Sequence, residues 1–194
     1  MIVDLIRHGE PLGGRRYRGQ IDDPLSDKGW QQMWSAVAAQ QPWQLIVTST
    51  LSRCRDFAWA FGERQGLKVF EEARFQEIGF GDWEGKTAAE VCAEDPERLN
   101  KFFTDPVACK PDSAETLIDF STRVIAAWDD VLRDHEGKHV LIVTHAGVIR
   151  VLTAHVLGMP IEHMFRLQVG NAAINRIQID AGRPPVLVTH NARL

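Results

Sequence analysis

The sequence predicts an α/β fold, built as a three-layer sandwich in which helices flank a mostly parallel central sheet. Short β-branched, apolar runs alternate along the chain with segments whose apolar residues recur at helical spacing. This alternation is typical of strand–helix–strand units. The chain has 194 residues, of which 44% are hydrophobic and 25% charged. That length and composition suit one well-cored domain, so we expect a single domain over residues 1–194.

Five strands are expected, each a short run rich in valine, isoleucine or leucine. They cover residues 2–6, 45–48, 140–144, 173–179 and 186–189. The first and the third of these strands are each followed by a histidine, His8 and His145. Ligands of open α/β sheets bind beyond the carboxyl ends of the strands, so we expect both histidines at one site.

Helical segments fill the intervals between the strands. They are expected over residues 26–38, 51–66, 87–96, 116–135 and 148–157. Ser26 is a suitable N-cap for the first helix, Gly66 suits the end of the second, and a Thr87–Glu90 capping box opens the third. Residues 86–112 are predicted to be an insertion that forms a modest cap over the site.

Charge and cysteine content argue against several classes of protein. A net charge of −4 argues against a general nucleic-acid binder. The three cysteines, Cys54, Cys92 and Cys109, form no Cys-x-x-Cys pair, which indicates a reducing compartment and neither a disulfide framework nor a zinc site. The N-terminus lacks a signal-peptide pattern, and no apolar run approaches the roughly 20 residues that span a bilayer. We therefore expect a cytoplasmic protein that binds neither membrane nor nucleic acid.

The chemistry is concentrated where the first and third strands end. The first strand delivers a cation, an imidazole and a flexible turn at Arg7, His8 and Gly9. A neutral imidazole is a nucleophile suited to attack on phosphorus near physiological pH. The second half of the site is expected at His145, which is also closely followed by a glycine. Taken alone, His8 fits a residue of the protein core equally well, and His145 has the alternative of a strand-end histidine bonded to the backbone.

Six ordered motifs resemble the histidine phosphatase, or phosphoglycerate mutase-like, superfamily over nearly the whole chain. They are Arg7–Glu10, Pro24–Gly29, Ser49–Cys54, Glu77–Gly85, Ala114–Thr116 and Thr144–Arg150. The resemblance implies the fold of that superfamily. The chain departs from the family pattern at Pro11, where threonine or serine is usual, and near Gly14, where asparagine is frequent.

By this resemblance His8 is the nucleophile, and its attack on phosphorus yields a phosphohistidine that water hydrolyses. Arg7, Arg53 and His145 form the phosphate pocket, with His145 protonated as a donor to the transferring oxygens. Fixed cations suit this role because a buried phosphate dianion has lost its hydration, and a guanidinium group forks onto two oxygens. Glu77 is the general acid for the leaving oxygen and later the base for the hydrolytic water.

Further residues are assigned to the substrate or compete for a role. Arg18 and Gln20, in the arginine-rich loop of residues 13–20, are predicted to bind the substrate, and so is Ala146. The other two arginines of this loop fit a solvated charge cluster equally well. Glu77 has competitors for the acid role in neighbouring motifs, and the family position favours Glu77. These competitors are Glu10, Asp82 and Glu84.

No cofactor and no metal is expected. The seven histidines form neither a His-x-His-x-Asp-His nor a His-Glu-x-x-His pattern, and the arginine and histidine cradle already supplies the positive charge that a metal would provide. The expected partner is a small-molecule phosphate monoester, and the expected state is a monomer or a homodimer.

The short chain and its modest cap favour a phosphatase over a phosphoglycerate mutase. Phe80–Glu84 and Leu157–Pro160 resemble the alpha-ribazole-5′-phosphate phosphatases of cobalamin biosynthesis. Trp83, Phe102 and Phe103 would then contact the dimethylbenzimidazole base, and a place in the protein core suits them equally well. The alternatives are a broad-specificity sugar-phosphate or nucleotide phosphatase, a mutase-like enzyme, and a non-catalytic regulator that binds phosphate.

Overall fold

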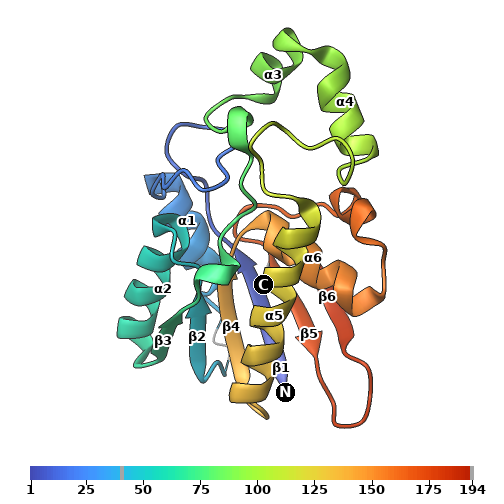
Figure 1. Cartoon of the computed structure of the whole chain (residues 1–194). Helices are drawn as coiled ribbons and strands as arrows, with labels where there is room; N and C mark the ends of the chain where they lie inside the picture. Colours follow the sequence, from blue (N-terminus) through green and yellow to red (C-terminus); the bar gives the residue numbers. More distant parts are fainter. Residues whose placement is uncertain (40–41, 193–194) are drawn as a thin grey trace.

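The computed structural model describes residues 1–39 and 42–192, which form a six-stranded sheet with helices on both faces (Figure 1). The strand order is β3-β2-β4-β1-β5-β6. The strands are β1 (Ile2–Arg7), β2 (Leu45–Thr48), β3 (Lys68–Glu71), β4 (His139–Thr144), β5 (Ile174–Gln178) and β6 (Val186–Ala192). The first four run parallel, whereas β5 pairs antiparallel with β1, and β6 with β5. The predicted fold class is confirmed.

The register of the two central strands brings the two histidines together. β1 and β4 are paired in parallel up to Arg7 and Thr144. One residue further, the backbone amide of His8 donates to the carbonyl oxygen of Thr144 at 2.9 Å. The residues that follow these strands, His8 and His145, are therefore neighbours at the carboxyl edge of the sheet.

Side chains that alternate along the strands form a core on each face of the sheet. In β1, Leu5 belongs to the core under α5 and α6, whereas Ile6 belongs to the core under α1 and α2. This alternation follows from the two-residue period of a strand. The helices that flank the sheet are α1 (Asp27–Ala36), α2 (Ser52–Gln65), α5 (Leu117–Asp134) and α6 (Ala146–Leu157).

Two elements are not predicted by the sequence patterns, β3 and the helix α4 (Pro96–Thr104). β3 is an edge strand whose side chains are mostly exposed, so it lacks the apolar run of a buried strand. Pro96 follows the helix α3 (Ala88–Glu94), which ends there as expected. The same proline is also the first residue of α4, a position where its missing amide hydrogen does no harm, and Asp95 caps the helix.

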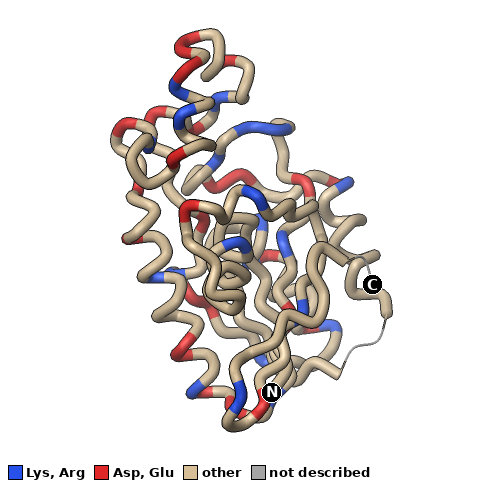
Figure 2. The backbone as a smooth tube through the Cα atoms, turned by 90° about the vertical axis from the view of Figure 1, so that its right-hand side faces the viewer, with Lys and Arg blue, Asp and Glu red and all other residues tan. Residues whose placement is uncertain are grey.

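α3 and α4 form an extension that stands away from the sheet beyond the carboxyl ends of β1 and β4 (Figure 1). Its small core consists of Trp83, Val91 and Phe102, each at most 2% exposed. Acidic and basic residues are interspersed along it (Figure 2). That residues 86–112 act as a cap, within a single domain, stays a prediction.

Short 3-10 segments link the larger elements: η1 (Ala73–Phe75), η2 (Gly81–Trp83) and η3 (Ile161–Arg166). The segment between η1 and η2 carries Glu77 and has no helix or strand of its own. Its conformation therefore depends on contacts with the rest of the fold. None of the helices within residues 1–39 and 42–192 combines the length and the apolar character needed to cross a bilayer.

Candidate active site

His8 directly follows β1, and its side chain is buried. Its Nδ1 atom lies 2.7 Å from the carbonyl oxygen of Gly9. Because a carbonyl oxygen only accepts, Nδ1 carries the proton and Nε2 keeps its lone pair. Burial, followed by the charges of Arg7 and Arg53, holds the pKa of His8 well below its usual value. At neutral pH the ring is therefore an uncharged imidazole with Nε2 available as a nucleophile.

His145 packs edge-on against His8, with the ring centroids 5.2 Å apart. Arg53 donates from Nε to Nδ1 of His145 at 3.3 Å, and Nε2 lies 2.8 Å from Oγ of Ser49. A guanidinium group only donates, so Nδ1 is the acceptor, and the Nε2 proton points to Ser49. Burial, followed by the charge of Arg53 and the ring of His8, holds the pKa of His145 well below its usual value.

Without a negative charge beside it, the ring of His145 is therefore favoured in its neutral form. Its protonation as a donor to the transferring oxygens of a bound phosphate stays a prediction. Its hydrogen-bond partners among the described residues are Arg53, Ser49 and Cys54, and none of them is an acid that would favour an imidazolium. A fixed cation in contact with Nδ1 disfavours a second positive charge.

Arg7 and Arg53 place two guanidinium groups beside the histidines. Arg7 donates from Nη1 to the carbonyl oxygen of Val169 at 2.7 Å, and its buried Nε has no hydrogen-bond partner among the described residues. Burial lowers the pKa of Arg7 to about 10, so the group is charged at neutral pH. Arg53, in the first turn of α2, is 1% exposed and donates to the carbonyl oxygens of Gly19 and Ile21 at 2.8 and 2.7 Å.

Glu77 reaches the same edge of the sheet from the segment between η1 and η2. Its Oε1 accepts from the amide of Ile78 at 3.1 Å, and its Oε2 accepts from the amide of Gly147 at 3.2 Å. A β-carbon on Gly147 would collide with Oε1, so with any larger residue here the carboxylate of Glu77 would have to move. The charge of Glu77 acts on Arg7, whose pKa it raises against the effect of burial.

Ala146 is the first residue of α6 and is buried. The amides of the first helical turn lack intrahelical acceptors and carry partial positive charge. One of them, the amide of Gly147, binds Glu77. The structure thus places Ala146 at a helix N-terminus beside the histidines, which suits an anion.

The contacts of Arg18 and Gln20 are with other parts of the protein and not with the two histidines. Arg18 is buried, and its guanidinium group donates to Asp23 and to the carbonyl oxygens of Leu12 and Gly14. These bonds hold its own loop together. Gln20 is exposed, and its backbone amide donates to Glu84. Substrate binding by the two side chains stays a prediction.

The competing acids are engaged elsewhere. Glu10 pairs with Lys28 at 2.8 Å, and Asp82 pairs with Arg98 at 2.9 Å. Glu84 accepts from the backbone amides of Phe80 and Gln20. Within the part of the chain that the structure describes, no group of three or more His, Cys, Asp or Glu is arranged to hold a metal ion.

Sequence reasoning assigned no role to several residues that support the site. Ser49 lies in one of the recognised motifs and binds His145. Arg150 ends another motif, and its guanidinium group is close enough for Glu77 to act on its pKa, which burial lowers. Arg123 lies outside the motifs and binds the backbone of the Glu77 segment. Its partners are distant in sequence, so only the folded structure reveals them.

Comparisons with known proteins identify the family of the chain. The family pattern described as the histidine phosphatase superfamily (branch 1) matches residues 3–193. A glucosyl-3-phosphoglycerate phosphatase of Mycolicibacterium vanbaalenii is 35% identical over 172 residues, which are 82% of this chain and 75% of that protein.

Two solved structures have a closely similar fold. The alpha-ribazole phosphatase of Shigella flexneri superposes with a TM-score of 0.85 at 28% identity, covering 100% of this chain and 97% of that one. A mycobacterial glucosyl-3-phosphoglycerate phosphatase in complex with inorganic phosphate superposes with a TM-score of 0.86 at 29% identity, covering 98% and 97%. The chain belongs to the histidine phosphatase superfamily, branch 1.

Proposed function

We propose that the protein is a phosphomonoesterase that transfers the phosphoryl group of its substrate to Nε2 of His8 and then to water. The observation that carries the proposal is the tautomer of His8. The carbonyl oxygen of Gly9 fixes the proton on Nδ1, so the lone pair of Nε2 is free beside Arg7, Arg53 and His145. A neutral nucleophile between fixed cations is an arrangement that suits phosphoryl transfer to a histidine.

In the first step, Nε2 of His8 forms a bond to phosphorus as the bond from phosphorus to the leaving oxygen breaks. Arg7 and Arg53 stabilise the charge on the non-bridging oxygens, and the buried Nε of Arg7 is a donor with no partner among the described residues. Glu77, protonated in the complex with the substrate dianion, gives its proton to the leaving oxygen. A bound dianion favours the charged form of a nearby imidazole, so substrate binding raises the pKa of His145, which then donates to the transferring oxygens.

In the second step, water attacks phosphorus and the bond from phosphorus to His8 breaks. Glu77, now a carboxylate, takes a proton from the attacking water, and inorganic phosphate leaves. The geometry supports this role because the carboxylate of Glu77 is held at the N-terminus of α6, next to the histidines. The phosphate complex of the mycobacterial relative supports a phosphate pocket of this kind.

For the substrate, we propose alpha-ribazole-5′-phosphate. Support comes from the motifs Phe80–Glu84 and Leu157–Pro160 and from the similarity to the Shigella enzyme. Two of the three aromatic residues expected to contact the dimethylbenzimidazole of this substrate are not accessible to it. Trp83 and Phe102 are 1% and 2% exposed and belong to the core of the extension. Phe103, which is 50% exposed, is the aromatic residue of the three that is available for contact.

Glucosyl-3-phosphoglycerate is a second candidate, because the relative of that name is 35% identical. Arg15 favours it. This residue is exposed, whereas the neighbouring Arg16 and Arg18 both pair with Asp23. Its charge also lowers the pKa of the buried Arg7, which indicates that Arg15 stands near the pocket. The name of this substrate implies a glycerate carboxylate, which a solvent-exposed guanidinium can bind.

The test is a panel of phosphate monoesters ranked by kcat/KM, which includes both candidates, nucleotides and 3-phosphoglycerate. We expect phosphate release from p-nitrophenyl phosphate and a clear preference within the panel. The variant His8→Ala is the control. An alkaline quench during turnover should preserve phosphate on His8 and an acid quench should remove it, because a phosphoramidate is labile in acid.

Two outcomes would overturn the proposal. Turnover no higher than that of His8→Ala would indicate a regulator that only binds phosphate. Conversion of 3-phosphoglycerate to its 2-isomer without release of phosphate would indicate a mutase.

A further inference from the structure

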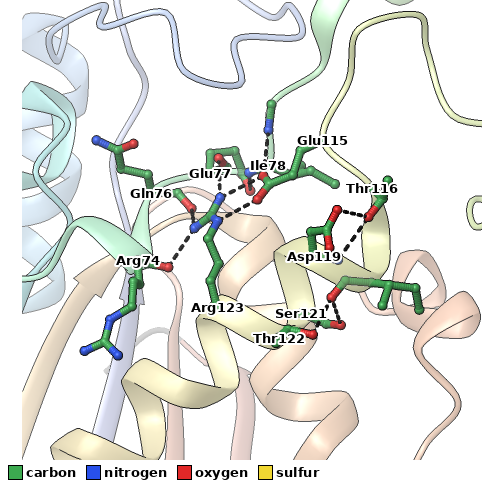
Figure 3. Close-up of polar contacts among 12 residues, drawn as sticks. Arg74, Gln76, Glu77, Ile78, Glu115, Thr116, Asp119, Ser121, Thr122 and Arg123 are labelled. Carbon is green, nitrogen blue, oxygen red and sulfur yellow. Dashed lines mark hydrogen bonds and ion pairs between the residues drawn. The ribbon is translucent and has the colours of Figure 1, made fainter.

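Arg123, on α5, divides the donors of its guanidinium group between the segment around Glu77 and the carboxylate of Glu115 (Figure 3). Nη1 donates to the carbonyl oxygens of Arg74 and Gln76 at 2.7 and 2.9 Å. Nη2 donates to the carbonyl oxygen of Glu77 at 3.1 Å and to Oε2 of Glu115 at 2.9 Å. Nε donates to Oε1 of Glu115 at 2.6 Å. An arginine has five N–H donors, and these five bonds account for all of them.

Glu115 completes the network from the residue just before the N-cap of α5. Its carboxylate accepts two bonds from Arg123, and its Oε2 also accepts from the amide of Gly79 at 3.2 Å. Its backbone amide donates to the carbonyl oxygen of Gly79 at 3.0 Å. The N-cap itself is Thr116, which accepts from the amide of Asp119 and fixes where the helix begins.

These bonds matter because the segment they hold has no helix or strand of its own. η1 ends at Phe75 and η2 begins at Gly81, and part of the backbone between them takes its partners from Arg123 and Glu115. Both sides of Glu77 are then fixed. Its carbonyl oxygen binds Arg123, and its carboxylate binds the amides of Ile78 and Gly147.

We propose that Arg123 and Glu115 form a positioning pair that holds the carboxylate of Glu77 against the leaving oxygen of the substrate. The proposal rests on the acid role given to Glu77 above. Arg123 acts through Glu77, so it is a positioning residue and not a catalytic one. A displacement of about 1 Å at a reacting group costs a large part of its contribution to the rate.

The experiment compares a poor and a good leaving group on one preparation of each variant. Glycerol phosphate needs a proton on its leaving alkoxide, whereas p-nitrophenyl phosphate does not. We expect Arg123→Met to lower kcat on glycerol phosphate by roughly 10-fold or more, and kcat on p-nitrophenyl phosphate by less than about threefold. The ratio of the two rates does not depend on the folded fraction, so a destabilised variant still gives a result.

Two further variants sharpen the test. Glu115→Gln keeps the size of the side chain but removes the negative charge that accepts two hydrogen bonds from Arg123. It should shift the ratio of the two rates in the same direction as Arg123→Met. Arg133→Met is the matched control on the same helix. Arg133 is 66% exposed and pairs with Asp130 and Asp134, so the ratio should stay at the wild-type value.

A double-mutant cycle separates this inference from the proposed function. In the Glu77→Gln background, Arg123→Met should change the rate on glycerol phosphate by less than about threefold, because the glutamine that it then positions has no acidic proton to give. Equal losses on both substrates, or fully additive losses in the cycle, would overturn the positioning role alone. If Glu77→Gln itself is unselective between leaving groups, the acid role fails and this inference fails with it.

Discussion

The protonation of His8 and His145 is decided by the residues around them, and it can be measured directly. In an NMR titration we expect both rings to stay neutral at about pH 6, because burial and the nearby arginines hold both pKa values well below the usual value. Inorganic phosphate should raise both pKa values, since a dianion stabilises an imidazolium.

The spectra of His8→Ala and His145→Ala assign the two signals. A ring that titrates at its ordinary pKa in the absence of phosphate would contradict the buried, arginine-flanked environment. Phosphate that leaves both pKa values unchanged would mean that the anion binds elsewhere on the protein.

For the residues of the site, the sequence predicts which side chains lie together, but not which of them are protonated. His8, Arg53 and His145 are expected together, and the structure brings them into contact. The charge of His145 is not predictable, because it depends on a guanidinium group 92 positions away and on complete burial. Arg123 escapes prediction for the same reason, since the carbonyl oxygens that it binds lie 46 to 49 positions away.

Among the structural elements, the extension of α3 and α4 has a core of its own, and its stability is expected to be local. Phe102 is 2% exposed and packs against Trp83 and Val91. Truncation to alanine leaves a cavity that costs about 3 kcal/mol in a typical core. We expect Phe102→Ala to speed amide hydrogen exchange in residues 88–104, while β1 and β4 keep their wild-type protection.

The neighbouring Phe103→Ala is the matched control for this prediction. Its side chain is 50% exposed, so its truncation should change exchange much less. Faster exchange throughout the sheet in Phe102→Ala would show that the extension and the sheet unfold as one cooperative unit.

Elements with a strong periodic pattern are the ones that the sequence predicts well. The helix expected over 116–135 is observed as Leu117–Asp134, because its apolar stripe and its cap at Thr116 are both visible in the sequence. β3 is missed because an exposed edge strand carries no such stripe. α4 is missed because Pro96 indicates the end of one helix as readily as the beginning of the next.

In the molecule as a whole, one buried carboxylate joins several strands of the sheet. Asp4 of β1 is fully buried and accepts from Arg176 of β5 at 2.8 and 2.9 Å. Trp43 Nε1 and His139 Nε2 lie 2.8 and 2.9 Å from the same carboxylate. Burial alone raises the pKa of Asp4, but the hydrogen bonds outweigh it, and the pKa is lowered overall.

This network predicts how the free energy of unfolding depends on acid. The pKa of Asp4 is lower in the folded chain, so the unfolded chain takes up the proton first as pH falls. The stabilisation is therefore complete above about pH 4 and is lost as pH falls further towards the folded pKa.

Asp4→Asn should lower the free energy of unfolding at neutral pH by roughly 3 kcal/mol, because it leaves buried donors without their charged partner. Urea unfolding followed by circular dichroism from pH 7 to about pH 2 measures both effects. The variant should lose less of its remaining stability than the wild type between about pH 4 and pH 2, and equal slopes for the two proteins would place the acid-sensitive group elsewhere in the fold.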